Sequence, residues 1–278
     1  MALISAAFLG CYDVLKKVSL KQSSVYEMLF FCCSSGFLVS LFFLNGISAD
    51  IIDILFILLK SMIIVVNWII VAKCLKKLDV AIVSGFSLVN TLLVVLGAYL
   101  FFGEPLGWVH LFSFIFIAIG TLLITRIERK DNNVKNDYKY LLLLLATNVL
   151  GASSGLLDKY IINYRGVEHD EILTFFLLFN AIIYFVIYLV KNKKIEFKKV
   201  KSNFYIVLTG VAIALADASY YYSLTISDSQ VSLISICRKL SVVIATILAS
   251  IFLKEKHLLK KLGVLVIMLI GVALPVFL

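Results

Sequence analysis

Charged residues make up only 15% of this 278-residue chain, whereas hydrophobic residues make up 62%. Soluble domains are about half apolar and about a quarter charged, so this composition excludes a soluble protein and indicates a membrane protein. Proline occurs twice and glycine 14 times, too rarely for a disordered or collagen-like chain. The net charge of +9 is therefore assigned to loops that face one side of a bilayer, not to nucleic-acid binding.

Motifs of catalysis and cofactor binding are missing as well. The three histidines stand apart, with no HExxH and no Cys/His cluster at metal-binding spacing. There is no GxSxG elbow, Walker loop or GxGxxG after a strand. The five cysteines lie in or beside apolar stretches without CxxC spacing, as small buried hydrophobes do. We expect no enzymatic activity, no cofactor and no metal.

Long apolar runs dominate what is present. A bilayer is crossed by about 20 mostly apolar residues whose backbone polar groups are bonded within the segment, so these runs are predicted to be helices. Most connections between them are short, which favours antiparallel helical hairpins. We predict ten spans, at residues 2–18, 25–44, 54–74, 79–102, 106–126, 139–160, 171–190, 203–224, 229–253 and 258–278.

A polar stretch near the midpoint divides the chain into two halves of five spans. We predict a first repeat at residues 1–127, a linker at 128–138 and a second repeat at 139–278. Because five is odd, the second repeat enters the membrane from the opposite face, which predicts an all-α fold of two inverted five-helix repeats. A shift of 151 residues aligns the halves, placing Phe101, Glu104 and Gly120 on Phe252, Glu255 and Gly271.

The basic residues alternate between the connections in the way that inversion requires. Loops after odd-numbered spans hold 21 of the 26 Lys and Arg residues, and loops after even-numbered spans hold only Lys159 and Arg165. Basic loops stay on the cytoplasmic side. The chain is therefore predicted to lie in the cytoplasmic (inner) membrane with both termini on its outer side. The remaining three, Lys60, Arg238 and Lys239, fall within spans.

With ten spans in two repeats, the chain resembles the EamA-type members of the drug/metabolite transporter superfamily. The matching segments are Leu100–Ile124, Ile251–Leu274, Ala7–Lys17 and Val149–Lys159. The resemblance implies a permease for small metabolites with a central cavity that works by alternating access. Two features depart from the family's pattern: Leu9 stands where Trp is usual, and the fourth span lacks its proline. Family members are also commonly drawn with both termini in the cytoplasm, whereas the loop charges of this chain place them outside.

Two adjacent cations, Arg238 and Lys239, lie near the middle of the ninth predicted span. A charge at a helix centre costs about 2.5–3.5 kcal/mol on insertion, so such residues usually face a cavity or a partner. Asp217 lies at a similar depth in the preceding span, and an Asp217–Arg238 ion pair is geometrically reasonable. Lys239 points about 100° away around the helix and is less fully compensated.

Further candidates for a substrate site have polar or aromatic side chains at comparable depth. Tyr220 and Tyr221 share the helical face of Asp217. The first repeat offers Asn67, Trp68, Ser87 and Asn90, although interhelical hydrogen bonding explains such residues equally well.

The other charges within or near the spans are expected to have local explanations. Lys60 is expected to extend its amine toward the membrane surface. Local pairing near helix ends, or extension of the charged group to the membrane surface, is expected for Asp13 with Lys16 and Lys17, and for Asp158 with Lys159.

Arg238 and Lys239 set against Asp217 leave a surplus of one positive charge, which favours an anionic or zwitterionic solute such as an amino acid. The predicted partners are this small molecule and the lipid bilayer, with no nucleic acid. The sequence does not identify a coupling ion, whether proton or sodium. The chain is expected to be a monomer or a weak homodimer. Two alternatives stay open: an exporter of lipophilic or cationic compounds recognised by Asp217, and a non-transporting scaffold or accessory subunit.

Overall fold

The computed structural model describes residues 1–103, 107–131, 137–192, 203–225, 237–255 and 257–277, and within them it contains helices and no strand. A short helical turn at residues 237–239 precedes α11. The helices are α1 (Ala2–Ser19), α2 (Val25–Ser40), α3 (Ile51–Leu75), α4 (Val80–Phe102), α5 (Trp108–Asp131), α6 (Asp137–Asn163), α7 (His169–Asn192), α9 (Tyr205–Thr225), α11 (Ser241–Leu253) and α12 (Leu258–Phe277).

Each predicted span coincides with helix, but several limits differ. The predicted start of the ninth span at 229 and the aligned Glu104 lie outside the described residues. Helix also occupies both edges of the predicted linker 128–138, since α5 continues to Asp131 and α6 begins at Asp137.

The second span is shorter than predicted because α7 holds the loop that follows it. Helix α2 ends at Ser40 and not at 44. Asp170 accepts a hydrogen bond from the Asn45 backbone N–H at 2.9 Å, and Glu171 accepts one from Ala49 at 2.8 Å. These carboxylates satisfy backbone donors of a non-helical segment, which removes the need for another helical turn.

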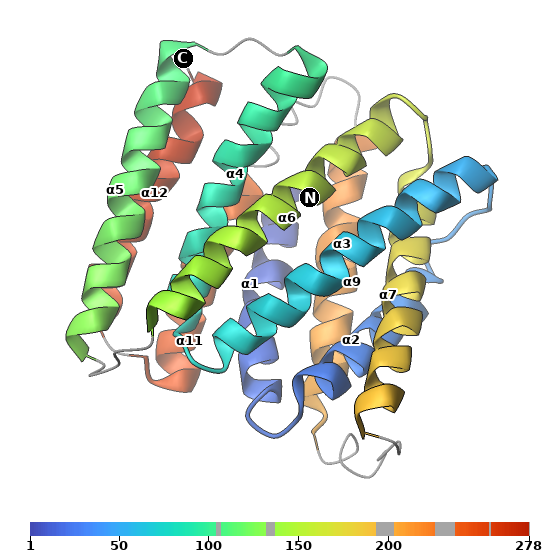
Figure 1. Cartoon of the computed structure of the whole chain (residues 1–278), viewed down its shortest axis with the longest axis horizontal. Coiled ribbons are helices and arrows are strands. Elements are labelled where there is room, and N and C mark those ends of the chain that lie inside the picture. Colours follow the sequence, from blue (N-terminus) through green and yellow to red (C-terminus); the bar gives the residue numbers. More distant parts are fainter. Residues whose placement is uncertain (104–106, 132–136, 193–202, 226–236, 256, 278) are drawn as a thin grey trace.

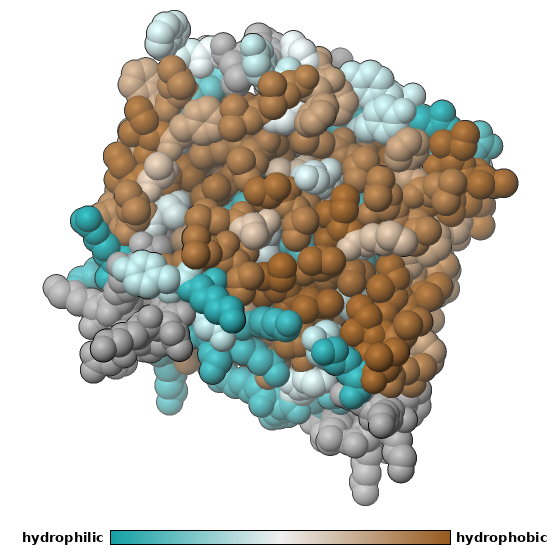
Figure 2. All heavy atoms as spheres, viewed as in Figure 1, coloured by the Kyte–Doolittle hydropathy of each residue, from teal (hydrophilic) through white to brown (hydrophobic). Residues whose placement is uncertain are grey.

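Among the described residues, five helices are long and apolar enough to cross a bilayer: α3, α4, α6, α7 and α9. The other five spans remain predictions. Figure 2 shows a broad hydrophobic surface over the bundle, with hydrophilic residues gathered mainly along its lower edge. An apolar exterior with polar edges is what a bilayer requires, and the chain is a multi-pass membrane protein.

Contacts between helices fit a two-repeat architecture (Figure 1). If α1 to α5 correspond in order to α6, α7, α9, α11 and α12, then the α1–α9 contact has its counterpart in α6–α3. The α1–α11 and α2–α9 contacts likewise correspond to α6–α4 and α7–α3. Three pairs, α2–α7, α4–α11 and α5–α12, map onto themselves. This exchange pattern is the one expected from a pseudo-two-fold axis between repeats.

Two glycines show the same reciprocity at the level of single residues. Gly120 in α5 lies directly against Met268 in α12, and Gly271 in α12 lies directly against Phe116 in α5. Gly120 and Gly271 are the residues that the 151-residue shift aligns. Both allow α5 and α12 to approach closely, as small residues do between membrane helices.

Gly210 in α9 is predicted to be intolerant of any side chain. A Cβ at this position would clash with the Cys32 carbonyl oxygen and the Ser35 hydroxyl of α2. Because backbone cannot rotate out of the way, we expect Gly210→Ala to destabilise the protein by about 2 kcal/mol. Thermal unfolding in detergent measures this, and Gly263→Ala is the control, since no atom lies within 4 Å of the Cβ position of Gly263. Equal melting temperatures for the two variants would contradict the prediction.

Four charged side chains join the ends of α1, α4, α11 and α12. Lys17 Nζ lies 3.2 Å from Glu255 Oε1 and 3.6 Å from Asp79 Oδ1. Lys261 pairs with Asp79 and lies 3.7 Å from Glu255 Oε2. Glu255 also accepts the Val80 N–H at 2.7 Å, at the start of α4. The side chains of Glu255 and Lys261 are only 4% and 2% exposed, whereas those of Lys17 and Asp79 are 16% and 28% exposed. This set of four charges, named here the basic-end network, is therefore buried on its Glu255–Lys261 side.

A further ion pair lies at the start of α3. Arg165, which follows α6, donates from Nε to Asp53 Oδ1 in the first turn of α3 at 2.6 Å. This hydrogen bond, together with the charge of Asp53, raises the pKa of Arg165. Arg165 is one of the two basic residues in the loops after even-numbered spans, and a carboxylate of the first half therefore compensates its charge.

Candidate functional site

A cavity of about 220 Å³ lies between helices of both halves. Side chains from α1, α3, α6, α7 and α9, and from the turn before α11, form its wall. They are Leu9, Tyr12, Lys60, Ile64, Trp68, Ser154, Asp158, Phe176, Ile213, Asp217, Tyr220, Tyr221 and Arg238. Five of the predicted site residues therefore meet here: Trp68, Asp217, Tyr220, Tyr221 and Arg238.

The first of two ion pairs on this wall joins Arg238 to Asp217, as predicted. The Arg238 guanidinium carbon lies 4.2 Å from the centroid of the Tyr220 ring, a distance typical of a cation–π contact. Asp217 lies in α9 and Arg238 lies shortly before α11, so the pair joins two segments of the second half. The pair neutralises both groups where solvent is scarce.

The second ion pair joins Lys60 of α3 to Asp158 of α6. Lys60 Nζ also donates to the Tyr221 hydroxyl at 3.2 Å and lies 4.3 Å from the Phe176 ring centroid. The prediction that Lys60 extends to the membrane surface is therefore wrong, and Asp158 has a partner on another helix. With its side chain 4% exposed, Lys60 is compensated by a counter-ion on a neighbouring helix instead of by water.

Aromatic rings connect the two ion pairs. Tyr220 contacts Arg238, Tyr221 contacts Lys60, and the centroids of the two tyrosine rings are 5.5 Å apart. Trp68 closes another part of the wall, with its ring edge-on to Phe176 at 5.9 Å. The cavity thus combines two pairs of charges with aromatic faces.

Lys239 lies outside this wall. Its Nζ donates to the Ser87 carbonyl oxygen of α4 at 3.2 Å, consistent with its different direction around the helix. The Asn90 amide donates to the Asn148 carbonyl at 3.0 Å, which is the interhelical role considered above. Asn67 is buried beside α6. A substrate role stays a prediction for all four of these residues: Asn67, Ser87, Asn90 and Lys239.

Asp13 and Lys16 also differ from expectation, because neither forms its predicted local ion pair in the described residues. Asp13 accepts a hydrogen bond from the Ser84 hydroxyl of α4 at 2.7 Å. Lys16 donates to the Tyr12 hydroxyl at 3.0 Å and lies 5.6 Å from the Trp68 ring centroid. Lys16 is therefore placed behind two rings of the cavity wall. Its amine contacts Tyr12 on its own helix and Trp68 on α3.

Charges on the cavity wall are balanced. Two cations, Lys60 and Arg238, face two carboxylates, Asp158 and Asp217. The predicted surplus of one positive charge does not apply to the wall itself, because Lys239 points to α4 and a second ion pair is present. A balanced wall offers a positive and a negative partner to one ligand.

Comparison with known families supports the resemblance seen in the sequence. The model of the EamA-like transporter family matches residues 1–126 and 138–277, nearly the whole chain. The chain belongs to the EamA-like transporter family. A solved crystal structure shares the fold of this EamA-like protein, with a TM-score of 0.68 and 14% sequence identity over 99% of this chain and 95% of the other. Comparison with curated proteins found no match.

Family membership makes this EamA-like protein a membrane transporter of the drug/metabolite type. The family is generally non-enzymatic, in agreement with the expectation from the sequence. A small-molecule substrate and a lipid environment follow from the same membership.

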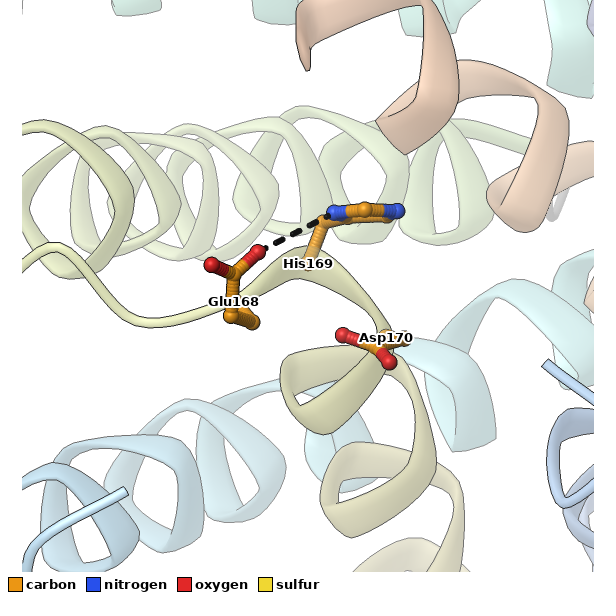
Figure 3. A group of neighbouring side chains, drawn as sticks. All are labelled: Glu168, His169 and Asp170. Atoms are coloured by element: carbon orange, nitrogen blue, oxygen red, sulfur yellow. Dashed lines mark ion pairs between the residues drawn. The ribbon is translucent and has the colours of Figure 1, made fainter. Parts of the chain in front are cut away.

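Glu168, His169 and Asp170 form a cluster at the start of α7 whose ligand atoms lie within 4.8 Å of one another (Figure 3). His169 Nδ1 is 3.8 Å from Glu168 Oε2, and Asp170 already accepts two hydrogen bonds from Asn45. Asp170 is thereby explained as an anchor for the loop after α2. None of the three residues lines the cavity.

Proposed function

We propose that this EamA-like protein is a secondary transporter that moves a small zwitterionic metabolite, such as an amino acid, across the cytoplasmic membrane by alternating access. The observation that carries the proposal is the cavity wall with its two ion pairs. The repeats at 1–127 and 139–278, with both termini outside, are part of the proposal.

A zwitterion suits this wall for an electrostatic reason. Breaking a buried ion pair by removing one partner is strongly unfavourable, because a charge is left uncompensated. A ligand with both charges inserts between the pairs and gives every group an opposite partner, whereas a simple anion or cation leaves one side without one. At about 220 Å³ the cavity is smaller than the roughly 300–1,000 Å³ of drug-sized sites, which favours a small metabolite.

The arrangement of the halves supports alternating access. Both halves contribute to the cavity, and inverted-repeat transporters bind substrate at such an interface. The basic-end network also connects the halves, because Lys17 and Asp79 belong to the first and Glu255 and Lys261 to the second. Opening a path past this network requires the halves to move relative to each other.

Transport by purified protein in liposomes tests the proposal directly. We expect uptake of radiolabelled neutral amino acids, with competition by other zwitterions and little competition by simple carboxylates or amines. Failure to move any zwitterion in a panel that includes organic acids and cations would overturn it. A panel in which no solute moves would instead favour the scaffold interpretation.

An exporter of lipophilic cations is the second candidate, and the aromatic wall with two aspartates favours it. Rings of Phe176 and Tyr220 already face cationic side chains. Under this function, Asp217→Asn abolishes resistance to lipophilic cations while Lys239→Gln leaves it intact. A transporter of zwitterions confers no such resistance in either form.

A further inference from the structure

We infer that the cavity orients its substrate, with the carboxylate of the zwitterion bound by Arg238 and the ammonium group bound by Asp158. This inference rests on the proposed function and assigns the two poles of the ligand to different ion pairs. It follows from which donors and acceptors of the wall remain available.

The available donors belong to Arg238. The Lys60 ammonium has three N–H donors, and Asp158 and Tyr221 accept two of them. Its side chain is only 4% exposed and lies over Phe176, so little of it reaches the cavity. The Arg238 guanidinium has five N–H donors, and in the part of the chain that the structure describes it makes one hydrogen bond, to Asp217. Its side chain is 22% exposed.

Guanidinium geometry matches a carboxylate better than an ammonium group does. Arginine presents a planar fork that binds both oxygens of a carboxylate at once. Tyr220 covers one face of the Arg238 plane at 4.2 Å, which leaves the edge with its N–H groups for a ligand. The carboxylate pole is therefore assigned to Arg238.

The matching acceptor lies on the other pair. Asp158 is 22% exposed, and within the described residues its contact to Lys60 uses one of its two oxygens. Asp217 is less exposed, at 14%, and sits beside the cation that takes the carboxylate. An ammonium group at Asp217 would lie beside the guanidinium that takes the carboxylate, whereas at Asp158 it can use the oxygen that does not contact Lys60. Adjacent Tyr220 and Tyr221 connect the two pairs and bring both poles within one small cavity.

Three ligands of the same carbon skeleton test the orientation: leucine, isocaproate without the ammonium group, and isoamylamine without the carboxylate. Each ion pair is neutralised as a unit, in Arg238→Gln/Asp217→Asn and in Lys60→Gln/Asp158→Asn, so that no unpaired charge is created. Binding to the purified full-length protein is measured by calorimetry, and melting temperature and gel filtration confirm folding. The two doubles are matched controls for each other.

We expect the Arg238/Asp217 double variant to bind leucine and isocaproate about tenfold or more weakly, with isoamylamine unchanged. The Lys60/Asp158 double variant should weaken leucine and isoamylamine by a similar factor, with isocaproate unchanged. The reversed pattern, or equal loss for all three ligands, overturns the orientation.

The proposed function and the orientation fail differently. If the wild-type protein binds and transports no zwitterion, the proposed function fails; if it binds leucine but the doubles show the reversed or uniform pattern, only the orientation fails. Should a double variant not fold, Arg238→Lys and Asp158→Glu replace it. Both keep the charge: Arg238→Lys changes the geometry of the carboxylate site and Asp158→Glu that of the ammonium site. Each is expected to weaken the same ligands as the double variant that it replaces.

Discussion

Leucine transport by the Arg238→Gln variant is expected to fall by about 100-fold, because charge-assisted hydrogen bonds contribute about 1.5–3 kcal/mol and each 1.4 kcal/mol is a factor of ten. The substitution removes the guanidinium from the cavity wall and leaves Asp217 without its ion-pair partner. Initial uptake rates in liposomes, at matched protein density, measure the effect. Membrane insertion should be unaffected, since removing a cation from a membrane helix lowers the cost of insertion.

Lys239→Gln is the matched control for this prediction. Its amine donates to the Ser87 carbonyl oxygen outside the cavity, and a glutamine amide can replace that hydrogen bond. Uptake within a few-fold of wild type is therefore expected, although from the sequence both adjacent cations are candidates for the substrate site. Loss of transport in Lys239→Gln with wild-type rates in Arg238→Gln would place the site on the α4 side of the helix.

Helix positions could be predicted closely because long apolar runs carry the signal and the bilayer fixes their length. Where limits differ, a distant contact is responsible, as at Ser40, where carboxylates of α7 hold the next loop. A contact between residues more than 120 positions apart leaves no local pattern in one sequence. The ninth span illustrates another limit, since hydropathy alone gives no reason to interrupt a helix before Ser241.

Half of the charged site was predictable and half was not. Asp217 and Arg238 flank one hairpin, so counting residues from the turn places them at one depth. Lys60 and Asp158 are 98 positions apart in different halves, and each has a plausible local explanation. The signal that could have found them is position: Lys60 lies near the start of the third predicted span and Asp158 near the end of the sixth, so both are near the same membrane face and carry opposite charge. Pairing of such residues is the default expectation in a membrane interior.

Glu255→Gln is expected to destabilise the folded protein by about 3 kcal/mol, the lower part of the range for removing one partner of a buried ion pair. The glutamine amide still accepts the Val80 N–H, so only the charge is lost. Lys261 then keeps Asp79 as its one carboxylate partner in the described residues, and Lys17 keeps Asp79 at 3.6 Å. Two cations, one of them buried, then share the single anion Asp79. Thermal unfolding in detergent measures the loss.

A double variant separates coupling from simple loss of a side chain. In Glu255→Gln/Lys17→Gln, one cation leaves with the anion and the remaining Lys261–Asp79 pair is balanced, so part of the stability should return. Glu168→Gln is the chemical control, because this carboxylate is 67% exposed and its change should stay within about 0.5 kcal/mol. If the double loses the sum of the two single effects, the four charges act independently. Partial recovery would instead show that the basic-end network acts as one electrostatic unit that holds the two halves together on the side where most Lys and Arg residues lie.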